Sequence, residues 1–302
     1  MDTERRRGLD FATAGGAAPV YYLSLGDSLA TGVQPIGAPE RQFRTDEGYA
    51  DQLGVVARQR LPNLSTVKLG YPGESTTTMI EGGLTAYPHG SQLDEAVAFL
   101  LGHRGCVAFV TIDIGFNDLP GYSLDAIPAG IASIDRNLPG ILGTLQEAAG
   151  PGTPIVGMTI YDAFLPLWLD GALGREMARM SVWDAVVPIN SHLRELYRTA
   201  GLRVADVEGA FATTDFETEV ELTGHGRVPV NVARACQWTW GCEPPPLGPD
   251  LHANVSGYGV IAQAFERVLQ DKLGRAHREP AGEARAGSGV LESCGARPPR
   301  AQ

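Results

Sequence analysis

The chain has 302 residues, of which 43% are hydrophobic and 20% charged, a composition typical of globular proteins and unlike that of a disordered chain. A chain of this length can bury a substantial core without metal ions or disulfides. Lys and Arg number 24 against 35 Asp and Glu, so the net charge is −11, which disfavours nucleic acid or an anionic membrane as a partner. No apolar run approaches the length needed to cross a bilayer, which argues against a transmembrane protein.

Composition changes along the chain predict its domain organisation. Residues 1–19 are charged and then rich in Ala and Gly, and we expect a flexible segment there. Residues 20–273 carry the periodic patterns of a folded domain, while residues 274–302 lack periodicity and are expected to be disordered. The first segment has no solid apolar stretch of the kind found in secretory signals, so we expect a cytoplasmic protein, with secretion as the alternative.

The four cysteines are too few for a disulfide scaffold and lack the paired spacing of a zinc site. Cys106 opens an apolar strand and is expected to be a core residue. Cys236 and Cys242 bracket a short segment with two tryptophans and would form a local disulfide in an oxidising compartment. We therefore expect no metal cofactor.

Short, nearly continuous apolar runs alternate with helical patterns along the chain. Strands are predicted at residues 20–25, 66–69, 107–114, 155–160 and 202–207. Helices are predicted at residues 47–61, 91–101, 127–149, 176–200 and 254–273. Pro139 is expected to kink or split the third helix, and Pro188 to interrupt the fourth.

This alternation predicts right-handed crossovers and a parallel sheet covered by helices on both faces. The fold class is therefore α/β, a doubly wound domain whose functional loops lie at the carboxyl ends of the strands. Residues 208–249 are too long for a plain loop and are expected to form a lid or insertion near the site.

Four short motifs place chemically useful groups at that edge. Ser28 follows the first strand, Gly73 follows the second, and Asn117 follows the third. His252 stands just before the last helix, beside Asp250. A hydroxyl, an imidazole and uncharged hydrogen-bond donors are the parts needed for acyl transfer.

The motifs resemble those of the SGNH hydrolases, also called the GDSL esterase/lipase family. The matching blocks, in order, are Gly26-Asp27-Ser28-Leu29, the turn at Gly73, Gly115-x-Asn117-Asp118, and His252 near the C-terminus. The resemblance covers about residues 20–273. It implies a three-layer, flavodoxin-like α/β fold with a five-stranded parallel sheet, and hydrolysis of esters without a metal or organic cofactor.

By this resemblance, Ser28 is the nucleophile and His252 its general base. The oxyanion hole is formed by the backbone N–H groups of Ser28 and Gly73 and by the side-chain amide of Asn117. Donors fixed in advance stabilise the charge that develops on the carbonyl oxygen.

One block departs from the family pattern, in which the acid precedes the histidine by three residues. Here Asp250 precedes His252 by two, a spacing that places both side chains on one side only in an extended segment. Prolines at 244–246 and 249 favour such a segment. Asp250 then completes a catalytic triad; the alternative is a Ser–His dyad whose ring is oriented by a backbone carbonyl.

Other residues near the motifs are expected to have structural roles or to line the pocket. Asp113, inside the third strand, is expected to be a buried acid that supports the Asn117 turn. Glu74 is expected to face solvent. Trp238 and Trp240 either pack against their own domain or form a wall of the acyl pocket, and Tyr161 follows the fourth strand as a candidate pocket residue.

The sequence thus predicts a serine esterase or lipase that acts on a small-molecule ester. The alternatives are an acyltransferase or thioesterase with the same site, or a non-catalytic doubly wound binding module. A nucleotide-binding domain is disfavoured because neither glycine-rich phosphate motif follows the first strand. The ester, its acyl length and the oligomeric state are left open by the sequence.

Overall fold

The structure is a computed structural model that describes residues 19–35, 42–119, 121 and 123–274. The segments predicted to be flexible or disordered lie almost wholly outside the described residues. At the centre is a five-stranded parallel sheet of order β4-β1-β5-β6-β7. Its strands are β1 (Val20–Gly26), β4 (Leu64–Lys68), β5 (Val107–Asp113), β6 (Ile155–Met158) and β7 (Arg203–Ala205).

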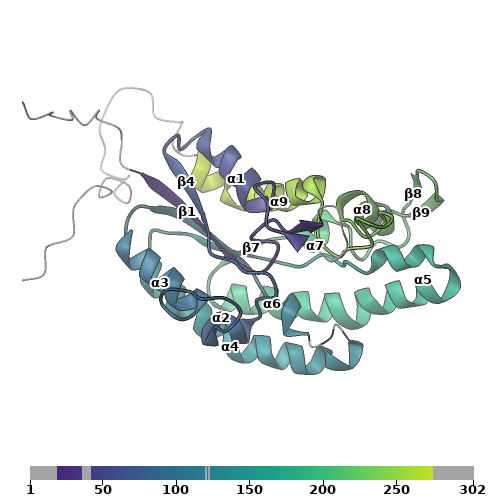
Figure 1. Cartoon of the computed structure of the whole chain (residues 1–302), viewed down its shortest axis with the longest axis horizontal. Helices are drawn as coiled ribbons and strands as arrows, with labels where there is room; N and C mark the ends of the chain where they lie inside the picture. Colours follow the sequence, from purple (N-terminus) through teal and green to yellow (C-terminus); the bar gives the residue numbers. More distant parts are fainter. Residues whose placement is uncertain (1–18, 36–41, 120, 122, 275–302) are drawn as a thin grey trace, which may run out of the picture.

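Helices cover both faces of this sheet, so the predicted doubly wound α/β fold is confirmed (Figure 1). On one face lie α1 (Tyr49–Arg58) and α9 (Val255–Gly274), which pack against each other. On the other face lie α2 (Thr76–Glu81), α3 (Gln92–Gly102), α4 (Ile127–Ala149) and α6 (Val187–Thr199).

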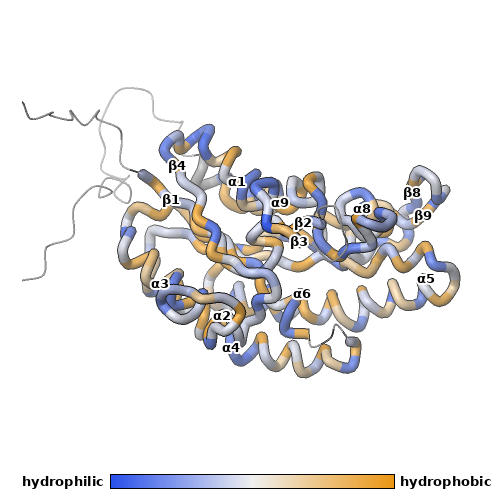
Figure 2. The backbone as a smooth tube through the Cα atoms, in the orientation of Figure 1, coloured by the Kyte–Doolittle hydropathy of each residue, from blue (hydrophilic) through white to orange (hydrophobic). Residues whose placement is uncertain are grey.

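Each face has its own hydrophobic core. One core contains Leu100, Leu142 and Leu193 from α3, α4 and α6, and the other contains Leu53 and Phe265 from α1 and α9. Along α4 and α5 (Gly171–Met180) hydrophobic and hydrophilic stretches alternate in Figure 2, as in helices that bury one side. Within the described residues, no helix combines the length and the apolar composition needed to span a bilayer.

The two predicted proline effects have different outcomes. α4 runs unbroken from Ile127 to Ala149 with Pro139 inside it, so of the predicted kink or split the split does not occur. Leu138 and Ile141, on either side of the proline, are fully buried, and this packing holds the helix together despite the missing N–H donor. The interruption near Pro188 is confirmed: a π-helical turn, Ser181–Val186, separates α5 from α6, and Pro188 lies in the first turn of α6, where it is tolerated.

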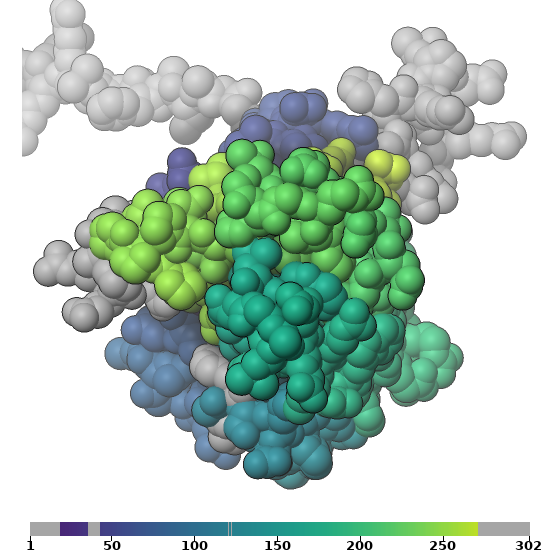
Figure 3. Space-filling view, turned by 90° about the vertical axis from the view of Figure 1, so that its right-hand side faces the viewer, coloured from purple at the N-terminus to yellow at the C-terminus, as the bar shows by residue number. Residues whose placement is uncertain are grey.

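The predicted insertion, residues 208–249, is folded rather than loop-like. It holds most of α7 (Val207–Ala210), the hairpin β8 (Glu219–Leu222) and β9 (Gly226–Pro229), and α8 (Val230–Trp238). A third hydrophobic cluster joins the insertion to the 3-10 turn Leu165–Leu169 that precedes α5. Figure 3 shows these teal and green segments side by side at one end of the molecule.

The order of the strands decides where the site lies. β1 pairs with β4 on one side and with β5 on the other, so the chain order reverses at β1. In open α/β sheets ligands bind outside the carboxyl ends of the strands at such a reversal. The turns after β1, β4 and β5 therefore meet at one place.

Candidate active site

The turn after β1 holds Ser28 at the edge of the sheet. It begins at Gly26, whose φ of +131° is unfavourable for residues with a side chain. A Cβ at Gly26 would also overlap the carbonyl oxygen of Asp113 on the neighbouring strand. Only glycine fits here, and the sharp turn brings Ser28 into the wall of a cavity.

Ser28, His252 and Asp250 form a hydrogen-bonded chain. Nε2 of His252 lies 2.9 Å from Oγ of Ser28, and Nδ1 lies 2.7 Å from Oδ1 of Asp250. The backbone N–H of His252 also donates to Oδ1 of Asp250, over 2.9 Å. One carboxylate oxygen therefore contacts both the backbone and the ring of the residue two positions on. Asp250 therefore contacts the ring nitrogen opposite the one that faces Ser28.

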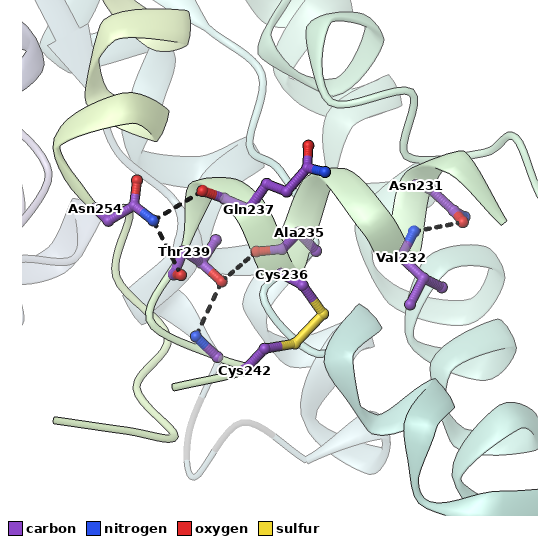
Figure 4. The surroundings of a disulfide bond; sticks show 9 residues. Asn231, Val232, Ala235, Cys236, Gln237, Thr239, Cys242 and Asn254 are labelled. Carbon is purple, nitrogen blue, oxygen red and sulfur yellow. Dashed lines mark hydrogen bonds between the residues drawn. A yellow bond between two sulfur atoms is a disulfide. The ribbon is translucent and has the colours of Figure 1, made fainter. Parts of the chain in front are cut away.

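The segment that carries these two residues is anchored to the end of α8. The backbone N–H of Trp240 donates to the carbonyl of His252, and the backbone N–H of Asp250 donates to the carbonyl of Trp240. A disulfide joins Cys236 to Cys242 around this anchor (Figure 4). In the same view, the Asn254 amide donates to two carbonyls at the end of α8. His252 and Asp250 are thus held by backbone pairing as well as by side chains.

Residues from the next two turns line the same cavity. Gly73, with a φ of +86°, and Asn117 line the cavity with Ser28. The Asn117 amide donates to Oδ2 of Asp27 over 3.1 Å and to the carbonyl of Glu74 over 3.0 Å. These bonds hold the amide at the cavity wall. Ser28, Gly73 and Asn117, which come from three separate turns, are brought together as the sequence motifs predicted.

Two buried acids lie beneath the Ser28 turn. Asp113 is 1% exposed and accepts hydrogen bonds from the backbone N–H of Asp27 and from the Tyr49 hydroxyl. It was expected to support the Asn117 turn, but its contacts support the Ser28 turn, because Asp113 pairs with Gly26 in the sheet. Burial raises the pKa of both Asp113 and Asp27, and the charge of Asp27 raises that of Asp113 further. The pair therefore favours a state that retains a proton.

Glu74 does not face solvent, so that prediction is wrong. The turn after Gly73 folds back toward the end of β1, and this leaves the Glu74 side chain fully buried. Its Oε2 accepts a hydrogen bond of 2.8 Å from the Gln92 amide. Burial raises the pKa of Glu74 above its ordinary value.

The cavity has a volume of about 440 Å³ and is walled largely by apolar side chains. Those that the motifs did not single out are Pro72, Phe116, Ile160, Ala163, Pro249 and Leu251. All of them lie within two residues of a motif residue or of Tyr161, and this proximity is the sequence signal that could have predicted them as lining residues. None of the described lining residues is lysine or arginine.

Of the three proposed pocket aromatics, only Tyr161 lines the cavity, and its hydroxyl donates to the carbonyl of Leu251. Trp238 instead packs edge-on against Phe211, with ring centroids 5.1 Å apart. Trp240 contributes its backbone, whose N–H and carbonyl bind His252 and Asp250. The described residues contain no group of His, Cys, Asp and Glu side chains that could hold a metal ion.

Comparisons with known proteins show the family and the fold of the chain. The model of the GDSL-like Lipase/Acylhydrolase family matches residues 24–260. No curated protein sequence is significantly similar to the chain.

Solved structures with the same fold are distant in sequence. A phospholipase A1 from Streptomyces albidoflavus is 17% identical, with a TM-score of 0.53, and the match covers 84% of this chain and 100% of that one. An extracellular lipase from Streptomyces rimosus is 18% identical, with a TM-score of 0.50 and coverage of 84% and 99%. A variant of an acetyl-xylooligosaccharide esterase from Geobacillus is 14% identical, with a TM-score of 0.50 and coverage of 89% and 99%.

Proposed function

The chain belongs to the GDSL-like lipase/acylhydrolase family and is a hydrolase of ester bonds, and from this premise we propose that it acts through an acyl-enzyme on Ser28. One observation carries the proposal: the hydrogen-bonded chain from Asp250 through His252 to the Ser28 hydroxyl. A serine is a weak nucleophile until an adjacent base takes its proton, and this chain supplies the base and its orienting acid.

In the proposed reaction, Oγ of Ser28 attacks the ester carbonyl carbon as its proton passes to Nε2 of His252. The carbonyl oxygen becomes an oxyanion that accepts hydrogen bonds from the Ser28 and Gly73 N–H groups and from the Asn117 amide, which exchanges its bond to Asp27 for one to the oxyanion. The oxyanion collapses, the alcohol leaves with the proton from His252, and the acyl group remains on Ser28. Water then repeats the steps with the same base, and this releases the carboxylic acid and restores Ser28.

We propose a neutral ester with an apolar acyl group as the substrate class. The apolar wall of the cavity favours burial of such a group. The acidic residues in the wall are Asp27 and Asp250, and no described lining residue is lysine or arginine, so neither cation is there to pair with an anionic acyl group.

The test of the nucleophile compares Ser28→Ala with wild type on p-nitrophenyl butyrate. The variant should lose essentially all activity and should no longer be labelled by a fluorophosphonate probe. The matched control is Ser65→Ala, at an exposed serine in β4, which should keep both. Full activity in Ser28→Ala would refute the proposal.

The substrate class is tested by a series of p-nitrophenyl esters from acetate to palmitate. A cavity of about 440 Å³ should favour intermediate chains over both ends of the series. The p-nitrophenyl ester of succinic acid, which carries a charged acyl group, should be much slower than the butyrate. A preference for the charged ester would contradict the proposed class.

A further inference from the structure

Gln92 is a fully buried amide behind the proposed catalytic centre, and it lies outside every motif that the sequence analysis singled out. It is the first residue of α3, whose start is fixed by the hydroxyl of Ser91, which accepts a hydrogen bond from the N–H of Asp94. A buried amide group is costly unless its donors and its acceptor are all used. The partners of Gln92 are therefore informative about its role.

One set of partners belongs to the nucleophile turn. Oε1 of Gln92 accepts from the backbone N–H of Gly26 over 2.7 Å, and Nε2 donates to the carbonyl of Gly26 over 3.0 Å. The side chain thus binds both polar atoms of one residue, as a neighbouring strand would. Gly26 is two residues before Ser28 and tolerates no side chain, so fixing its peptide groups fixes the start of the Ser28 turn.

Nε2 of Gln92 also contacts the Tyr87 hydroxyl over 3.3 Å, and a further partner belongs to the turn after β4. Nε2 of Gln92 also donates to Oε2 of Glu74 over 2.8 Å. Glu74 directly follows Gly73, and its carbonyl accepts the bond of 3.0 Å from the Asn117 amide. A single side chain therefore connects the segment that carries the nucleophile with the segment that carries the Gly73 donor and contacts the Asn117 amide.

This connection matters because the three oxyanion donors follow three different strands and are far apart in the sequence. Their relative positions depend on contacts between the turns. We propose that Gln92 is a positioning residue that holds the Ser28 turn and the Gly73–Glu74 turn at the spacing that one oxyanion requires. The inference rests on the proposed acyl-enzyme function.

Such a role predicts an effect on kcat rather than on KM, because the oxyanion exists only after attack on the carbonyl. Misplacement of a catalytic group by about 1 Å can cost about 10²-fold in rate. Gln92→Met, which keeps the length of the side chain but removes its hydrogen bonds, should therefore lower kcat by about 10²-fold. Its KM for p-nitrophenyl butyrate should stay close to that of wild type.

The matched control is Leu100→Ala on the same helix. Leu100 is 1% exposed and packs in the core beneath α3, far along the helix from Gly26, so this variant loses stability without touching either turn. Both variants are assayed well below their unfolding temperatures. Leu100→Ala should keep kcat, whereas a Gln92→Met kcat within threefold of the control value would overturn the inference.

A second pair of variants tests the connection itself and replaces Gln92→Met if that variant does not fold. Gln92→Glu keeps the shape but places a carboxylate against Glu74, and its kcat should fall at least as far. Adding Glu74→Gln restores a donor–acceptor pair between positions 74 and 92 with the roles exchanged, while the bond to the Gly26 carbonyl stays lost. The double variant should regain at least tenfold in kcat over Gln92→Glu; no recovery would overturn the inference.

Failure of this inference is distinguishable from failure of the proposed function. In the first case Ser28→Ala is inactive while the Gln92 variants keep kcat. In the second case Ser28→Ala itself remains active.

Discussion

Replacement of Asp250 by asparagine removes the negative charge next to His252 and keeps the shape of the turn. The asparagine oxygen can still accept the backbone N–H of His252, which donates to Asp250 over 2.9 Å. The two side chains are only 9% and 14% exposed, so water screens the pair little. With the ring nitrogen 2.7 Å from the carboxylate, the charge centres are roughly 4 Å apart, which corresponds to about 4 kcal/mol at an effective dielectric constant near 20.

In the proposed mechanism His252 takes the proton of Ser28 during attack on the ester, so this energy stabilises the transition state and not the bound substrate. A loss of about 4 kcal/mol lowers kcat by about 10³-fold and leaves KM nearly unchanged. The assay is the steady-state hydrolysis of p-nitrophenyl butyrate at pH 8, with Asp184→Asn, at an exposed aspartate, as the control. A fall in kcat of less than tenfold would refute the reasoning and favour a Ser–His dyad.

Asn117→Ala removes one proposed oxyanion donor and should lower kcat by about 10²–10³-fold in the same assay; a loss below tenfold contradicts that role. Burial raises the pKa of Asp162 to about 6, above its ordinary 3.8, so ionisation of this side chain opposes folding. As the pH rises from 4 through 6, the free energy of unfolding of wild type should therefore fall by up to about 3 kcal/mol relative to that of Asp162→Asn. Urea unfolding at pH 4 and pH 7.5 measures this, and an unchanged difference contradicts it. Replacing Cys236 and Cys242 by serine opens a short loop and should lower the free energy of unfolding by about 2 kcal/mol, whereas equal urea midpoints would contradict it.

Local patterns in the sequence determined the layers of the fold and most of the proposed machinery. Short apolar runs predicted the strands, because a parallel strand buried on both faces has no polar side. The motif around Ser28 and those at Gly73 and Asn117 were visible because each follows a predicted strand and uses a residue type tied to one chemical task. The 127–149 helix also matches α4 at both ends.

Contacts between distant segments decided the rest. The spacing of Asp250 and His252 left two alternatives open, and the pairing of that segment with Trp240 fixes the extended shape in which the carboxylate meets the ring. The burial of Glu74 and the two-sided binding of Gly26 by Gln92 depend on how α3 docks against the end of β1. A polar residue at a turn or at the start of a helix faces solvent unless another element covers it, and only the tertiary structure shows which element does so.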